Sequence, residues 1–293
     1  MNLHGIHALV FAGDVAPASV EKIIRQSKQA GFGLVEFSIH EPETLNVAHT
    51  RALLQEYGMQ VACSRGLAFD ADASSDDPAV VARGKALLVQ AVELTHALGG
   101  SYFCGVPYSA LGKYSRPVTQ LGREHVIETL RDLSALAKTK GITLGLEVVN
   151  RYETNVVNTA RQALDLIDKV GADNIVVHLD TYHMNIEEVD FVQPVLDCGD
   201  RLGYVHVGEN HRGYLGSGTI DFGGFFKALA RIDYQGPITF ESFSSTVVAA
   251  GLSNDLAVWR NLWDDGMDLA THAHGYIAAL AQGAGLGVTG RPY

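Results

Sequence analysis

The chain has 293 residues, of which 47% are hydrophobic and 19% are charged, a composition typical of a folded globular protein and not of a disordered one. A formal net charge of −11 opposes a nucleic-acid partner, because phosphate binding depends on clustered Lys and Arg. The chain shows neither the positive start of a secretory signal nor an apolar stretch of roughly 18 residues, so we expect a cytoplasmic protein without a membrane partner.

The N-terminal half alternates apolar, strand-like runs with segments in which apolar residues recur at helical spacing. A polar segment ending in Asp77 and Pro78 supplies the cap and the first turn of a long helix, which Gly99 and Gly100 end. The predicted strands comprise residues 3–11, 33–40, 59–64 and 101–106, and the predicted helices comprise residues 20–30, 46–57, about 78–98 and 118–140.

The C-terminal half continues the same alternation, so that eight predicted strands are each followed by a helix. Strict alternation implies a parallel sheet with right-handed crossovers. Eight such units predict a closed (β/α)8 barrel, the TIM-barrel architecture, formed by residues 1–293 as a single domain. Its strands here are predicted at residues 142–148, 175–180, 202–207 and 237–240, and its helices at 159–170, 191–196, 222–232 and 253–281.

A doubly wound open sheet is the alternative fold, but the turn after the first strand, FAGDVAPAS, lacks the glycine pattern of a dinucleotide-binding sheet. The pattern does occur at Gly285, Gly287 and Gly290, where no strand precedes it, and we interpret residues 283–293 as a flexible tail. The three cysteines have no short paired spacing, which excludes a disulfide framework and a thiolate zinc site. We interpret Cys63 and Cys104 as small apolar side chains of strands.

Four chemically active side chains end successive strand-like runs: Glu147, Asp180, His206 and Glu241, at separations of 33, 26 and 35 residues. In a (β/α)8 barrel these positions converge, because the C-terminal ends of all strands share one face. Three carboxylates and one imidazole suit a divalent ion such as Mn²⁺, Mg²⁺ or Co²⁺, whose charge offsets the repulsion among the acids. The sequence therefore predicts a metal site, whereas His178 is interpreted as a side chain of the interior layer.

The motifs around these residues resemble those of the ketose 3-epimerases, a group that includes D-tagatose, D-allulose and L-ribulose 3-epimerases. The group belongs to the xylose-isomerase-like sugar isomerase and epimerase superfamily. The resemblance is dense in the C-terminal half and thinner in the N-terminal half, where it includes HGI, SSDDPAV and GVPYSALGKY. The C-terminal motifs are GLEVVNRYETN, LDTYHMNIEE, LGYVHVGENHRGYLGSGTIDF and ITFESF.

The resemblance implies a metal-dependent inversion of free ketoses at C3, through a cis-enediolate that the metal stabilises. Expected pairs are L-ribulose and L-xylulose, D-fructose and D-allulose, and D-tagatose and D-sorbose. It implies Mn²⁺ as the ion, with Co²⁺ or Mg²⁺ as alternatives, and a homodimer or homotetramer. The four residues above would bind the ion, Glu147 and Glu241 would also be the acid/base pair, and Glu153, His183 and Arg212 would hold the O1 to O3 end of the ketose.

This mechanism agrees with the chemistry of the reaction. A ketose C3 proton is weakly acidic, so its removal needs a Lewis acid on O2 and O3, and inversion needs a second group that returns a proton from the opposite face. The first loop, HALVFAGDV, lacks the tryptophan common in relatives, which leaves the preferred ketose open. Candidates for the O4 to O6 end of the sugar are His7, Gly66, Leu67, Tyr108 and Phe243.

Three alternatives to an epimerase remain at this stage. An aldose–ketose isomerase or a related dehydratase would use the same fold. A metal-dependent nuclease for abasic DNA would need more histidines and a basic face, and a non-catalytic sugar-binding relative would be expected to lose Glu147 or Glu241. In the C-terminal helical region, Trp259 and Trp263 stand at a spacing that fits an interface between subunits or, preferably, packing on the barrel.

Overall fold

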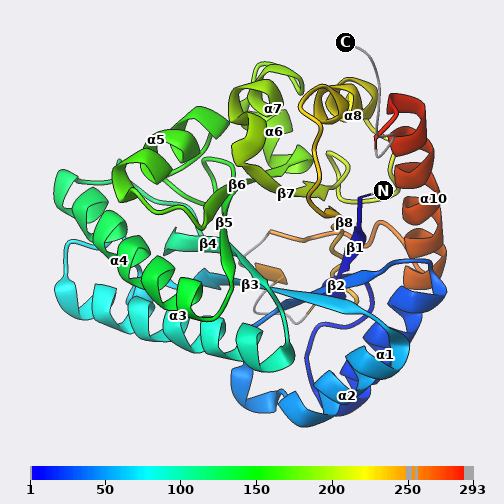
Figure 1. The fold of residues 1–293 in the computed structure, drawn as a ribbon, viewed down its shortest axis with the longest axis horizontal. Coiled ribbons are helices and arrows are strands. Elements are labelled where there is room, and N and C mark those ends of the chain that lie inside the picture. The colour runs from blue at the N-terminus through cyan, green and yellow to red at the C-terminus, as the bar shows by residue number, and fades with distance from the viewer. Residues whose placement is uncertain (1, 249–252, 255–256, 287–293) are drawn as a thin grey trace.

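The computed structural model describes residues 2–248, 253–254 and 257–286, and the strands among them close into one parallel barrel (Figure 1). Neighbouring strands pair in chain order, and the ring closes where β8 pairs with β1. The prediction of a single (β/α)8 barrel is therefore confirmed. The strands are β1 (His4–His7), β2 (Leu34–Ser38), β3 (Gln60–Leu67), β4 (Tyr102–Ala110), β5 (Thr143–Val148), β6 (Ile175–Asp180), β7 (Leu202–Val207) and β8 (Ile238–Phe240).

Helices form an outer layer around the strands, as Figure 1 shows. Among the described residues, no helix is both long enough and apolar enough to cross a membrane. Short 3-10 turns occur at Ala8–Val10, Pro42–Thr44, Phe69–Ala71 and Gly199–Arg201. The helices are α1 (Pro17–Gln29), α2 (Val47–Tyr57), α3 (Pro78–Leu98), α4 (Gln120–Thr139), α5 (Ala160–Val170), α6 (Thr181–Glu187), α7 (Gln193–Cys198), α8 (Phe222–Arg231) and α10 (Gly266–Ala284).

Local sequence determines where the long helices begin and end. The Asp77 carboxylate accepts a hydrogen bond from the Ala79 amide at the start of α3, and Gly99 ends this helix in the left-handed conformation with φ 88°. At α5, Thr159 and Gln162 satisfy each other's backbone amides in a capping box. These ends agree with the sequence-based boundaries.

The C-terminal region differs from its prediction as a helix over residues 253–281. Helix α10 begins only at Gly266, because the Asp265 carboxylate accepts hydrogen bonds from the first amides of the helix and so fixes its start there. The two tryptophans before it do not share one helical face: Trp263 is buried, whereas Trp259 is 69% exposed. Of the expected tail, residues 283 and 284 belong to α10 and residues 287–293 lie outside the described residues.

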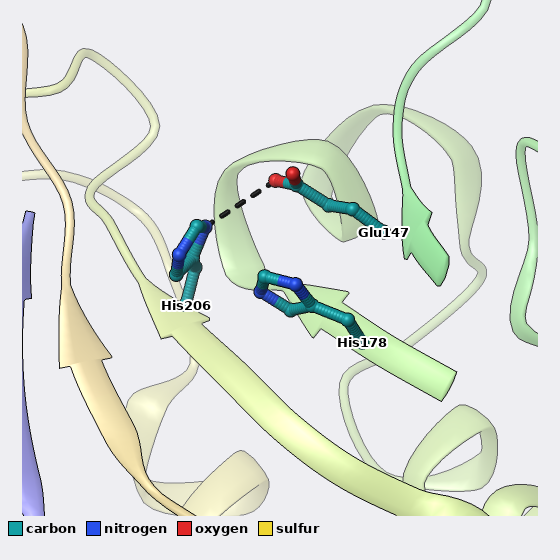
Figure 2. A group of neighbouring side chains, drawn as sticks. All are labelled: Glu147, His178 and His206. Atoms are coloured by element: carbon teal, nitrogen blue, oxygen red, sulfur yellow. Dashed lines mark hydrogen bonds and ion pairs between the residues drawn. The ribbon is translucent and has the colours of Figure 1, made fainter. Parts of the chain in front are cut away.

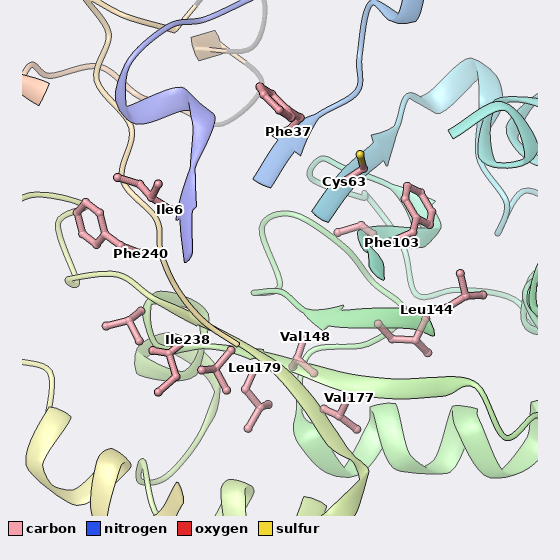
Figure 3. Packing of buried hydrophobic residues seen from close by; sticks show 14 of the residues in the cluster. Ile6, Phe37, Cys63, Phe103, Leu144, Val148, Val177, Leu179, Ile238 and Phe240 are labelled. Carbon is pink, nitrogen blue, oxygen red and sulfur yellow. The ribbon is translucent and has the colours of Figure 1, made fainter. Parts of the chain in front are cut away.

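Two clusters make up most of the apolar core and alternate along the strands, and a third, small one consists of Leu9, Phe243 and Val248. A small cluster of Leu34, Ala62, Tyr102, Cys104 and Tyr204 fills the barrel interior. A larger cluster lies between the strands and the surrounding helices, and Figure 3 shows part of it. All three cysteines are free and buried, in keeping with a packing role.

Close packing between α3 and the loop before it leads to a stability prediction. A Cβ atom on Gly84 would lie 2.1 Å from the carbonyl oxygen of Ala71. Because this oxygen belongs to the backbone, it cannot easily move away. We expect Gly84→Ala to lower the free energy of unfolding by about 1–3 kcal/mol through overpacking, measured by chemical denaturation. The matched control is Gly275→Ala in α10, where an added Cβ meets nothing within 4 Å. Its expected effect is a gain of up to about 1 kcal/mol, and equal effects of the two substitutions would contradict this account.

Candidate active site

The ends of four successive strands bring four potential ligands together. Glu147 lies near the end of β5, Asp180 ends β6, His206 lies near the end of β7 and Glu241 directly follows β8. All four side chains are buried, and one ligand atom from each lies within 4.8 Å of the others. The convergence follows from the barrel, because parallel strands present their C-terminal ends on a single face.

The imidazole of His206 lies among the three acids. Its Nδ1 atom is 3.3 Å from Oε1 of Glu147, 3.5 Å from Oε1 of Glu241 and 4.0 Å from Oδ2 of Asp180 (Figure 2 shows the contact with Glu147). Its Nε2 atom faces the other way and lies 2.8 Å from Oε2 of Glu36. A hydrogen bond from Nε2 to Glu36 leaves Nδ1 facing the three acids, where it offers a lone pair to an ion once the ring gives up its second proton.

Glu36 is a residue of the site that the sequence analysis missed. It lies in the middle of β2, is fully buried, and also accepts a hydrogen bond of 3.0 Å from the Tyr204 hydroxyl. Burial raises the pKa of this carboxyl, but the attraction of His206 and His7 outweighs burial and holds the pKa well below its usual range. An acid inside the apolar run LVEFS, at an inward-facing position, was the available signal.

The residues fit a divalent cation. When ionised, three carboxylates can only accept hydrogen bonds, and so can Nδ1 of His206 once the ring is neutral with its proton on Nε2, toward Glu36. Four acceptors that face one another are stabilised by a cation, and a set of three oxygens and one nitrogen matches hard or borderline divalent ions. Without an ion, the cost of keeping these buried acids ionised is seen at Glu147. Burial raises the pKa of this carboxyl to about 7, although His206 opposes the shift.

Asp180 also begins a short helix, α6, which was not predicted. Its Oδ1 atom accepts a hydrogen bond of 2.6 Å from the Tyr182 amide, so one carboxylate oxygen caps the helix while the other faces the site. The helix places His183 over the four potential ligands, with Nε2 3.7 Å from Oδ2 of Asp180 and 3.9 Å from Oε1 of Glu147. No helix was predicted between residues 180 and 191, and the cap at Asp180 explains why one forms here.

Asn150 fixes the orientation of both His183 and Glu153. The Asn150 amide N–H donates to Nδ1 of His183 over 3.2 Å, and the Asn150 side-chain amide donates to Oε1 of Glu153 over 2.8 Å. Burial lowers the pKa of His183 to about 3, so the ring is neutral at pH 7. Because Nδ1 accepts, the proton lies on Nε2, which faces the acids and lies 3.9 Å from Oε2 of Glu153.

Arg212 reaches the site from the loop after β7. Its Nη1 atom donates to Oε2 of Glu241 over 2.5 Å and to Oδ2 of Asp180 over 3.1 Å. The guanidinium lies 3.9 Å above the centre of the Tyr182 ring and 4.9 Å from that of Phe243. Burial lowers the pKa of Arg212, but Asp180 and Glu241 outweigh it and raise the pKa, so the group is a permanent cation.

Next to these groups lies a pocket of about 70 Å³, and it separates the candidates for the distal end of a sugar into two groups. Three of them, His7, Gly66 and Phe243, line this pocket together with Glu147, Glu153, His183, Arg212 and Glu241.

The other two candidates do not line this pocket. Leu67 lines a neighbouring cleft of about 920 Å³, and Gly66, next to it on β3, lines both that cleft and this pocket. Tyr108 is fully buried, and its hydroxyl donates to the carbonyl oxygen of Glu147 over 2.5 Å. Tyr108 therefore supports the strand behind Glu147 and does not line the pocket.

The contact between Glu36 and His206 gives a second prediction. Glu36→Gln removes the charge that orients His206, so we expect divalent-ion affinity to fall about 10–100-fold, measured by isothermal titration calorimetry. Asp72→Asn is the control, since Asp72 is a buried acid whose hydrogen bonds go to Ser74 and Tyr114 and not to the site. An equal loss in both variants, or no loss in Glu36→Gln, would show that Glu36 does not orient the ligand.

Comparisons with known proteins show the family to which the chain belongs. Residues 24–269 match the family model described as "Xylose isomerase-like TIM barrel". An L-ribulose 3-epimerase of Methylomonas sp. (strain DH-1) is 51% identical over 274 residues, which cover 94% of this chain and 96% of that protein. A ketose 3-epimerase of Arthrobacter globiformis is 48% identical over 273 residues, covering 93% of this chain and 94% of that protein.

Solved structures give the same result at the level of coordinates. The crystal structure of a D-allulose 3-epimerase from Methylomonas sp. in complex with D-allulose superposes with a TM-score of 0.93 and is 50% identical. The match covers 95% of this chain and 96% of that chain. A structure of an L-ribulose 3-epimerase, 40% identical, superposes with a TM-score of 0.95 over 100% of both chains.

Proposed function

Since the chain belongs to the xylose isomerase-like TIM barrel family, and within it to the ketose 3-epimerases, we propose that it inverts free ketoses at C3. The observation that carries this function is the convergence of Glu147, Asp180, His206 and Glu241 within 4.8 Å at the mouth of the barrel. The pocket beside them is lined by groups able to hold sugar hydroxyls. Substrates of this class are L-ribulose, D-fructose and D-tagatose with their C3 epimers.

We assign one divalent ion to the four converging residues, with Mn²⁺ as the expected ion and Co²⁺ or Mg²⁺ as alternatives. The preference rests on the donor set of three carboxylates and one imidazole. When bound, such an ion supplies Lewis-acid stabilisation of the negative charge that develops on the ketose oxygens when C3 is deprotonated. Glu36, behind His206, holds the imidazole in the tautomer that this role requires.

Glu147 and Glu241 form the acid/base pair in this proposal. They come from β5 and from the end of β8, on different sides of His206, so each can face one side of the C3 centre. One carboxylate removes the C3 proton and the other delivers a proton to the opposite face, which inverts the centre. Burial raises the pKa of Glu147 to about 7 in the ion-free site, and a bound ion would keep this carboxylate deprotonated, in the form that accepts the C3 proton.

Three further residues position the ketose. His183 presents its Nε2–H toward the acids and is assigned to O2, while the carboxylate of Glu153 accepts from a hydroxyl at the O1 to O3 end. Arg212 supplies a fixed positive charge beside Asp180 and Glu241. At the far end of the pocket, His7, Gly66 and Phe243 are proposed to contact the O4 to O6 end of the sugar.

The location and assembly of the protein are part of the same proposal. We assign the enzyme to the cytoplasm, in keeping with its acidic, charged surface and small sugar substrates. A homodimer or homotetramer is proposed, and the exposed Trp259 side chain near the site supports a subunit contact in this region.

Solvent exchange at C3 tests the proposed function. The metal-loaded protein is incubated with D-fructose, D-tagatose and L-ribulose in deuterated water, and the products are examined by NMR. The expected result is the C3 epimer of at least one ketose with deuterium at C3. Carbonyl migration to an aldose would identify the aldose–ketose isomerase instead, and no change in any of the three sugars would refute both.

The pKa of Glu147 predicts how ion binding depends on pH. Burial raises this pKa to about 7, and the acids around His206 outweigh burial and raise the pKa of that imidazole as well, so both groups hold protons below neutrality. Ion binding must displace these protons, so Mn²⁺ affinity should rise between pH 5 and 7 by about tenfold per pH unit for each proton released. Calorimetry in buffers of different ionisation enthalpy counts the protons. Binding of Mn²⁺ to the Glu147→Gln variant should release fewer protons. If the Mn²⁺ affinity of the unsubstituted protein did not change with pH, the assignment would be contradicted.

A further inference from the structure

His178 lies in the barrel interior on β6, two residues before Asp180, and no role has been assigned to it. Its side chain is fully buried, yet neither ring nitrogen has a hydrogen-bond partner among the residues that the structure describes. A buried polar group without a partner costs about 1–3 kcal/mol, so proteins rarely keep one without a function for it. An imidazole without partners is also available as a ligand.

The surroundings of His178 show where such a ligand would act. Its ring packs edge to face against His206, with ring centres 4.2 Å apart and an angle of 82° between the planes. The ring also packs against Tyr204, whose hydroxyl is already bonded to Glu36 and Thr239 and so does not serve the imidazole.

Glu147 completes a group of three side chains around this position. Figure 2 shows Glu147, His178 and His206 approaching one another from neighbouring strands. One ligand atom from each lies within 4.8 Å of the others, the same limit that holds for the four ligands at the mouth of the barrel. Glu147 and His206 therefore belong to two possible ligand sets, one completed by Asp180 and Glu241 and the other by His178.

We propose that Glu147, His178 and His206 form a second, inner coordination position for a divalent ion, which selects Zn²⁺. Two imidazoles and one carboxylate match the nitrogen-rich sets that hold zinc, whereas the outer set, with three carboxylates, matches Mn²⁺. Both positions need Glu147 and His206, so only one can be filled at a time. An ion in the inner position gives up Asp180 and Glu241.

The inner position has a consequence for the enzyme. Zinc held there uses Glu147 and His206 without Asp180 and Glu241, so the outer position cannot hold its own ion at the same time, which makes Zn²⁺ an inhibitor that competes with Mn²⁺. The inference rests on the proposed function only for the identity of the outer ion. His178 touches no substrate in this account, and its effect is confined to the choice of metal.

Titrations of zinc and manganese into variants of the ion-free protein test the proposal. His178→Met removes the imidazole ligand and fills its place in the interior with an apolar side chain. The Zn²⁺ dissociation constant should then rise about tenfold or more, while that for Mn²⁺ changes less than about twofold. The reciprocal variant, Asp180→Asn, should weaken Mn²⁺ about tenfold or more and Zn²⁺ by less than about twofold. Equal losses of both ions in His178→Met, or no loss of zinc, would overturn the inner position.

A second measurement needs no substitution. X-ray absorption at the zinc edge of the zinc-loaded protein counts the imidazoles around the ion: two are expected, and one would refute the proposal. Exchange of C3 hydrogen by the manganese-loaded, unsubstituted protein is measured in parallel. Absence of exchange would count against the epimerase, whereas a single imidazole on zinc counts against the inner position alone.

Discussion

Replacing Glu241 with glutamine is expected to reduce epimer formation by about 10³-fold or more, a loss of about 4 kcal/mol of transition-state stabilisation. Glutamine keeps the size of the side chain and an oxygen for the ion, but it cannot take or return a proton. Burial, which raises the pKa of Glu241, is outweighed by His206 and Arg212, so the pKa is lowered and the group is ionised at neutral pH. The substitution therefore removes a base that is ready to act.

The remaining glutamate makes this test sharper. With Glu147 intact, one of the two epimers should still exchange its C3 hydrogen with deuterated water without being inverted, as measured by NMR. Glu147→Gln should show the same pattern for the other epimer. The control is Glu128→Gln, an exposed acid on α4, which should keep full activity. Epimer formation by Glu241→Gln at the normal rate would exclude the two-glutamate mechanism.

Removal of the divalent ion by a chelator should abolish epimerisation and leave the barrel folded. The ketose C3 proton is too weakly acidic for a carboxylate to remove without a Lewis acid, so we expect a rate loss of about 10³-fold or more. The fold should persist because a closed ring of paired strands and a continuous apolar core, including Phe37, Phe103 and Leu144, hold it together.

Two measurements separate these effects. Activity should return when Mn²⁺ is added back, while the far-ultraviolet circular dichroism spectrum should not change on chelation. The free energy of unfolding should fall only by the amount that ligand linkage predicts. That amount is about 2.7 kcal/mol when the ion was present at 100 times its dissociation constant, and the melting temperature should fall accordingly. Full activity in excess chelator would exclude a metal-dependent reaction.

The barrel and the convergence of its strand ends could be predicted because both follow from periodic patterns. Alternating strands and helices determine the parallel topology, and this topology places Glu147, Asp180, His206 and Glu241 on one face. Neither step needs the detailed packing of side chains. The motifs then identified the chemistry.

The features that escaped prediction depend on contacts between residues far apart in the chain. Glu36 ends no strand, and its partner His206 is 170 residues away, so no local pattern links the two. Tyr108 lies after a strand-like run in sequence, but β4 continues through it and turns its hydroxyl to the backbone of Glu147. Helix α6 begins at Asp180, which caps the helix and also belongs to the group of four converging side chains, a double use that spacing alone does not reveal.

Because β8 pairs with β1, the barrel can close only after nearly the whole chain has been synthesised. His4 pairs with Ile238, so β1 gains its second neighbouring strand only after the ribosome has synthesised nearly the whole chain. At a synthesis rate of about 5–20 residues per second, that wait lasts roughly 10–50 s. Glu241 follows directly after this last strand, so a nascent chain or a fragment that lacks β8 also lacks one of the four converging side chains. The four residues therefore come together only when the barrel closes.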